Sequence, residues 1–191
     1  MIDPFDARPI IVAIAGPNGA GKTTFYEAHL APGGLRFVNA DDLARELGVD
    51  AYAAAEVARQ LRQALVEEGE SFVFETVLSD PEGEKVAFLR AAEARGYTVV
   101  LCFIGLEGAE LSEERVAMRV LQGGHDVPTE KLQSRYPRTL RNLARAIRDL
   151  PHVWVFDNSD LGRPFRKVAV FARGELVEKH EPLPAWVPGG R

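Results

Sequence analysis

The segment GPNGAGKTT, residues 16–24, constrains the fold more than any other part of the sequence. It follows the apolar run PIIVAIA and precedes an amphipathic stretch, so we predict a strand, a glycine-rich turn and a helix in that order. Glycines let successive backbone N–H groups point at one anion, and the helix N-terminus adds partial positive charge. The segment therefore predicts a phosphate-binding loop of the P-loop type.

We expect this loop to hold a nucleoside triphosphate. The Lys22 ammonium should reach the β- and γ-phosphates, and the Thr23 hydroxyl should bind Mg²⁺. The residues expected to line the nucleotide are Gly16, Pro17, Asn18, Gly19, Ala20, Gly21, Lys22, Thr23 and Thr24.

Strand-like and helix-like segments alternate along the rest of the chain. Apolar runs at residues 9–15, 36–40, 71–77, 97–106 and 152–158 are separated by amphipathic segments, among them one that ends at Leu47 and one from Ala51 to Glu68. This alternation predicts an α/β fold of three layers, a P-loop NTPase with a mostly parallel five- or six-stranded sheet. Ser79-Asp80-Pro81 predicts a cap and a first-turn proline for the helix that follows. Residues 166–180 predict a hairpin or an edge addition.

Length and composition favour one domain over residues 1–191, with a helical lid at about 112–135 and a C-terminal hairpin and tail at about 163–191. The net charge of -5 argues against nucleic acid or an anionic membrane as a partner. The single cysteine, Cys102, excludes a disulfide framework and fits a cytoplasmic location. The N-terminus lacks a signal-peptide pattern, and no apolar run reaches the ~20 residues of a membrane span.

Two acidic positions at strand ends are candidates for chemistry. Asp41 and Asp42 follow the second strand where a helix begins, so either could cap that helix, but both cannot cap it well. One of them is therefore available for catalysis. Glu75 ends the third strand, where it could face the metal through water, bind the acceptor or be an exposed strand-end acid; Thr76 is its expected hydrogen-bonding neighbour.

The cationic groups come from the predicted lid. Gly123-Gly124 separates a helix carrying Arg119 from a long helix carrying Arg135, and both arginines are candidates for phosphate contact. His125 could bind substrate or stabilise the hinge. Asn158 and Ser159, after the fifth strand, could approach the base or form an Asx turn. A solvated helix face is expected for Arg138, Arg141, Arg145 and Arg148.

Taken together, GPNGAGKTT, VNADDLA, FVFETVLS, RVAMRV, GGHDVP, RYPRTLRNL and VFDNS resemble the zeta-toxin family of P-loop kinases, in its compact bacterial branch. The resemblance covers roughly residues 10–160. It implies ATP- and Mg²⁺-dependent phosphorylation of a sugar hydroxyl, as on UDP-N-acetylglucosamine, and an antitoxin partner. It also implies that Asp41 is the general base, that Glu75 helps hold the acceptor, and that Arg119 and Arg135 neutralise the transferring phosphoryl group.

A P-loop by itself serves several classes of protein. The residues favour a kinase that acts on a hydroxyl of a small molecule. The alternatives are an ATPase that drives a conformational change, and a nucleotide-dependent switch that binds a partner protein. Loss of phosphoryl transfer after Asp41→Ala would indicate the kinase, whereas a switch would keep its partner binding.

Overall fold

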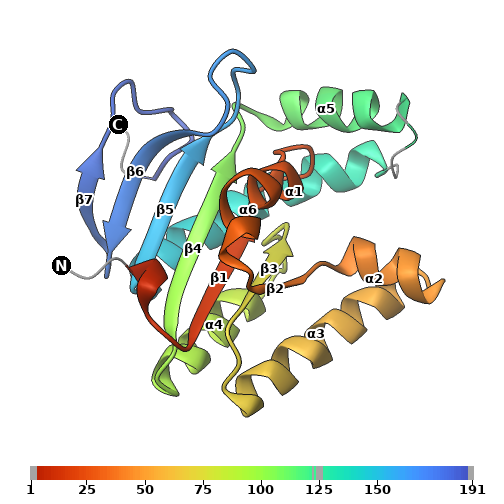
Figure 1. Ribbon diagram of the computed structural model, residues 1–191. Coiled ribbons are helices and arrows are strands. Elements are labelled where there is room, and N and C mark those ends of the chain that lie inside the picture. Colours follow the sequence, from red (N-terminus) through yellow and green to blue (C-terminus); the bar gives the residue numbers. More distant parts are fainter. Residues whose placement is uncertain (1–3, 122, 124–126, 189–191) are drawn as a thin grey trace.

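The computed structural model describes residues 4–121, 123 and 127–188. Seven strands form one sheet in the order β2-β3-β1-β4-β5-β6-β7, and the first five of these are parallel (Figure 1). The strands are β1 (Ile10–Ala15), β2 (Arg36–Val38), β3 (Phe72–Thr76), β4 (Thr98–Gly105), β5 (His152–Asp157), β6 (Arg166–Ala172) and β7 (Glu175–Lys179). The α/β fold with a mostly parallel sheet is confirmed. There are seven strands because both halves of the last segment pair antiparallel, β6 with β5 and β7 with β6.

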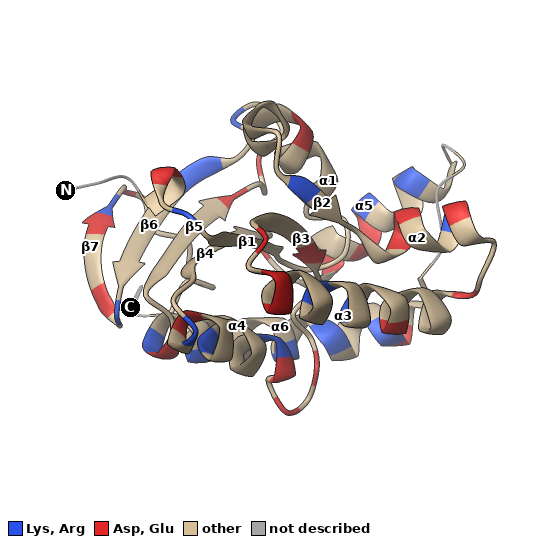
Figure 2. Cartoon of the chain, turned by 60° about the horizontal axis from the view of Figure 1, so that its bottom comes forward, with Lys and Arg blue, Asp and Glu red and all other residues tan. Residues whose placement is uncertain are grey.

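The helices cover the two faces of the sheet unequally. They are α1 (Lys22–Phe25), α2 (Ala40–Leu47), α3 (Ala51–Glu68), α4 (Glu84–Ala94), α5 (Ala109–Leu121) and α6 (Thr129–Asp149). Figure 2 shows α3, α4 and α6 together on one side of the sheet and α1 on the other. Only short turns continue α1, a π-helical turn at Tyr26–Leu30 and a 3₁₀ turn at Ala31–Gly33. The α1 face of the sheet is therefore thinly covered.

Strand β1 contributes to the core on both faces. All six of its residues are buried, as expected for a central parallel strand that has no solvent-facing side. Ile10, Val12 and Ile14 belong to the apolar cluster beside α1, whereas Ile11 and Ala13 belong to the larger cluster beside α3, α4 and α6. This packing fixes the end of β1, where the phosphate-binding loop begins.

Helices α2 and α3 have the predicted ends. Gly48 and Gly69 end them in the left-handed conformation, and the Asp50 carboxylate caps α3 by accepting from the Tyr52 and Ala53 amides. These signals are local in sequence. Among the helices that the structure describes, none is long and apolar enough to cross a membrane.

The predicted cap at Ser79-Asp80-Pro81 is wrong. Helix α4 begins at Glu84, and its N-cap is Gly83, which has φ 78° and makes no side-chain cap. Residues 77–83 instead form a connection that α6 holds: the Asn142 amide donates to the carbonyls of Leu78 at 2.9 Å and Asp80 at 2.8 Å. Side chains of α6 thus supply hydrogen bonds to carbonyls of this segment outside a helix.

Candidate active site

The loop between β1 and α1 has the backbone that phosphate binding requires. Gly16, Gly19 and Gly21 have φ values of 149°, 73° and 82°, which side chains rarely allow. A Cβ on Gly16 would lie 2.0 Å from the Ile104 carbonyl oxygen. The loop therefore passes directly against the end of β4, and glycine is required there. These residues fit a phosphate group held by backbone amides ahead of α1.

Lys22 is the charged centre of the site. Its side chain is only 6% exposed, and Nζ donates to the Pro17 carbonyl at 3.0 Å and lies 3.7 Å from Glu75 Oε1. Burial lowers the pKa of Lys22; the negative charges of Glu75 and Asp41 oppose this shift, and the positive charge of Arg119 adds to it. Carboxylates from two elements and an arginine from α5 therefore act on one P-loop lysine.

Glu75 lies beside the predicted metal-binding hydroxyl. Strand β3 pairs with β1 in a register that sets Glu75 opposite Ile14, next to the start of the loop. Thr23 Oγ1 donates to Glu75 Oε2 at 2.8 Å, and Asn39 Nδ2 approaches the same oxygen at 3.4 Å. A hydroxyl next to a carboxylate is an oxygen donor pair of the kind Mg²⁺ uses. Within the described ranges, no group of three or more His, Cys, Asp or Glu side chains could form a metal cluster.

Neither aspartate at the start of α2 is its cap. Asn39 is the N-cap, and its Oδ1 accepts from the Asp41 amide at 2.8 Å. The Asp42 carboxylate pairs with Arg45 one turn along the helix. The Asp41 carboxylate is exposed and lies close enough to Lys22 for its charge to affect that residue. Asparagine is a strong N-cap residue, so Asn39 itself was the sequence signal for the start of α2.

The segment predicted to be a lid, about residues 112–135, covers most of α5 and the start of α6. The positive charge of Arg119, on α5, helps to lower the pKa of Lys22, so this predicted arginine lies near the site. Arg135 on α6 is half-buried and makes no hydrogen bond or ion pair in the part of the chain described here. His125 lies outside the described residues. The Thr76 hydroxyl accepts from the Leu78 amide at 3.1 Å, and among the described residues it makes no hydrogen bond to Glu75.

Sequence reasoning did not predict that side chains of Asn158, Ser112 and Arg115 hold the P-loop in place. The Asn158 amide donates to the Ala20 carbonyl at 2.9 Å and accepts from the Phe165 amide at 3.2 Å. Ser112 Oγ donates to the Asn18 carbonyl at 2.6 Å. Arg115 donates to the Asn158 carbonyl at 2.8 Å. The start of α5 and the end of β5 are therefore tied to the loop that holds phosphate.

Fold and site together define a nucleotide-binding protein of the P-loop kinase class. Residues 38–167 match the family model described as Zeta toxin, and the chain belongs to this family. The matched range contains Asp41, Glu75 and Arg119 and begins after the P-loop itself. A comparison with curated protein sequences found no match.

Solved structures share the fold at low sequence identity. A complex of AvrRxo1-ORF1 and AvrRxo1-ORF2 with sulphate ions matches with TM-score 0.66 and 22% identity over 89% of this chain and 60% of that chain. The PezAT toxin–antitoxin system of Streptococcus pneumoniae matches with TM-score 0.59 and 19% identity, over 85% and 72%. Shikimate kinase from Bacteroides thetaiotaomicron matches with TM-score 0.52 and 16% identity, over 81% and 89%. This chain thus spans less than two thirds of the AvrRxo1 chain.

Proposed function

We propose that this protein is an ATP- and Mg²⁺-dependent kinase that transfers the γ-phosphoryl group to a hydroxyl of a small molecule. The observation that carries the proposal is the charge environment of Lys22, on which Asp41 from the start of α2 and Arg119 from α5 both act. A P-loop lysine near both an exposed carboxylate and an arginine of the predicted lid fits the arrangement that phosphoryl transfer to a hydroxyl needs. A switch would need the P-loop but would not need a general base for an acceptor hydroxyl.

In the proposed reaction, Asp41 accepts the proton of the acceptor hydroxyl. The hydroxyl oxygen bonds to the γ-phosphorus, and the bond from that phosphorus to the bridging oxygen breaks, which leaves ADP. Lys22 and Arg119 neutralise charge on the transferring group. Mg²⁺, when bound, neutralises phosphate oxygens, and Thr23 with Glu75 would hold it. The Thr23–Glu75 hydrogen bond supports this metal-side role for Glu75 over the acceptor-holding role that the resemblance implies.

The remaining site residues and partners rest on family membership. Zeta toxins that resemble this chain phosphorylate a UDP-sugar, so UDP-N-acetylglucosamine is the first acceptor to test. Thr76 and His125 would lie on the acceptor side, and Arg135 would meet the phosphates if the start of α6 moved toward the P-loop. The match to the PezAT toxin–antitoxin system supports an antitoxin as a protein partner. A related complex was solved with ATP, which supports ATP as the donor.

The test is a transfer assay read by mass spectrometry. Purified protein is incubated with ATP, Mg²⁺ and UDP-N-acetylglucosamine, and then with a pooled bacterial metabolite extract. We expect a product heavier by one phosphoryl group. Loss of a general base typically costs about 10²–10⁴-fold in rate, so Asp41→Asn should remove the product while ATP affinity stays unchanged.

Asp42→Asn is the matched control, since it neutralises the neighbouring carboxylate, which pairs with Arg45. This variant should keep near-normal transfer. ATP consumption with no phosphorylated product, equal in wild type and Asp41→Asn, would refute the mechanism and indicate an ATPase. Absence of any turnover with both acceptor sources would contradict the kinase and favour a nucleotide-dependent switch.

A further inference from the structure

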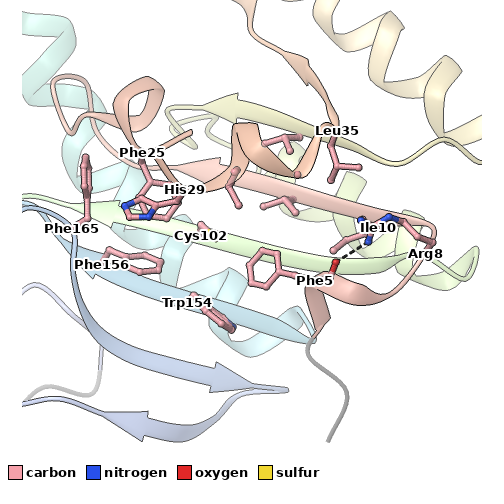
Figure 3. A pocket seen from close by; sticks show the side chains of 14 residues that line it. Phe5, Arg8, Ile10, Phe25, His29, Leu35, Cys102, Trp154, Phe156 and Phe165 are labelled. Atoms are coloured by element: carbon pink, nitrogen blue, oxygen red, sulfur yellow. Dashed lines mark hydrogen bonds between the residues drawn. The ribbon is translucent and has the colours of Figure 1, made fainter. Parts of the chain in front are cut away.

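A cavity lies on the thinly covered face of the sheet, below α1 and away from the edge that holds the P-loop. Its volume is about 370 Å³, within the range of small-molecule sites. Figure 3 shows the cavity between the strands and the segment that continues α1. It exists because α1 has four residues and is followed by short turns, so none of the described helices covers β1, β4 and β5 fully on this side.

The floor and the two ends of the cavity are apolar and largely aromatic. Strand residues form the floor, among them Val12 and the buried Cys102. At the end near the P-loop, the centroid of the Phe25 ring lies 4.9 Å from that of Phe156 and 5.4 Å from that of Phe165. At the opposite end, the rings of Phe5 and Trp154 meet edge to face with 5.1 Å between their centroids. Both side chains are labelled in Figure 3. Aromatic walls at both ends favour a flat apolar body.

Among the described residues that line the cavity, the charged groups have one sign. Arg8 and His29 can carry positive charge, and none of the described lining residues is acidic. The Arg8 guanidinium is held in place by one nitrogen, which donates to the carbonyls of Phe5 at 2.7 Å and Ala7 at 2.6 Å. Its other two nitrogens have no partner among the described residues. A fixed guanidinium at the rim with free donors matches a carboxylate or sulfonate.

We propose that this cavity is a binding site for a small aromatic anion, with the ring between the two aromatic ends and the acidic group on Arg8. The site is separate from the candidate active site, whose charged groups, Lys22, Glu75, Asp41 and Arg119, are all absent from its lining. Phe25 connects the two, because it lines the cavity and lies three residues after Lys22 in α1.

The probe for the test is anilinonaphthalene sulfonate, an aromatic anion whose emission rises in apolar surroundings. We expect saturable binding to the folded protein with one site per chain, and no displacement by saturating ATP. Arg8→Gln should weaken binding about tenfold, the effect of one charge-assisted contact. Arg141→Gln is the matched control: this arginine is exposed on α6, on the opposite face of the sheet, and its loss should leave the affinity unchanged.

A second variant tests the cavity independently of charge. Leu35, half-buried at the wall, can be replaced by tryptophan to fill the space, and Leu35→Trp should abolish binding in protein that still melts cooperatively. Equal affinity in Arg8→Gln and Arg141→Gln would overturn the anion site. Competitive displacement by ATP would also overturn it, because the cavity would then belong to the nucleotide site. The measurement needs no catalysis, so its result is independent of the kinase proposal.

Discussion

Asn158 offers a direct test of how the P-loop is supported. Its side chain is 4% exposed and makes two hydrogen bonds, to the Ala20 carbonyl and from the Phe165 amide. Asn158→Ala removes both bonds and leaves two backbone groups unsatisfied, at about 1–3 kcal/mol for each buried group. We therefore expect the free energy of unfolding to fall by about 2–4 kcal/mol, measured by urea denaturation.

The same substitution should weaken ATP binding, measured by calorimetry, because the end of the P-loop loses its support. Asn158→Asp is a sharper variant, since it keeps the acceptor for Phe165 but sets a carboxylate oxygen against the Ala20 carbonyl. Ser159→Ala is the control, because Ser159 bonds to Asp157 and to the Glu107 amide and not to the P-loop. ATP affinity that is unchanged in both Asn158 variants, or a stability loss below about 0.5 kcal/mol in Asn158→Ala, would refute the reasoning.

Three further predictions concern stability and reactivity. Gly16→Ala should cost about 3 kcal/mol of unfolding free energy, because its Cβ would strike the Ile104 carbonyl, whereas Gly33→Ala, which meets open space, should stay within about 0.5 kcal/mol; equal denaturation midpoints would contradict this. Burial raises the pKa of the Cys102 thiol to about 12, so iodoacetamide near neutral pH should alkylate it only after unfolding, and rapid alkylation of the native protein would argue against that burial. Burial and the positive charge of Arg173 lower the pKa of His152, and the negative charge of Glu93 opposes this shift. As the pH falls through 6.5, His152 is therefore protonated in the unfolded chain before it is protonated in the folded one, and the free energy of unfolding decreases. His152→Gln should flatten this acid-side slope of the melting temperature, and an unchanged slope would count against the burial effect.

The features that the sequence predicts well are those encoded by neighbouring residues. The P-loop motif specifies its own turn because glycine is needed at positive φ, and the ends of α3 follow from Asp50 and Gly69. The alternation of apolar and amphipathic segments likewise predicts the parallel sheet. Each of these features depends on interactions within a few residues, so one sequence is enough to find them.

Contacts between distant segments could not be predicted in this way. The bond from Asn158 to Ala20 spans 138 positions, and those from Asn142 to residues 78 and 80 span more than 60. Each requires knowledge of which loop lies against which helix. Arg145, placed by periodicity on a solvated face, donates instead to the Glu82 carbonyl for the same reason. The local pattern predicts the helices and strands, but long-range packing decides which partners their side chains have.

The antiparallel pair β6 and β7 determines when the growing sheet gains a protected edge. Strand β5 is mostly apolar, and the backbone groups on one of its sides stay unpaired until β6 joins it. A nascent chain that has emerged only to about residue 160 therefore exposes a strand edge that can pair with other chains. Strand β7 ends the finished sheet with Glu175, Glu178 and Lys179, charges that discourage pairing with another molecule. This protection therefore comes only after the five parallel strands have been synthesised, and a chain truncated before Arg166 would lack it.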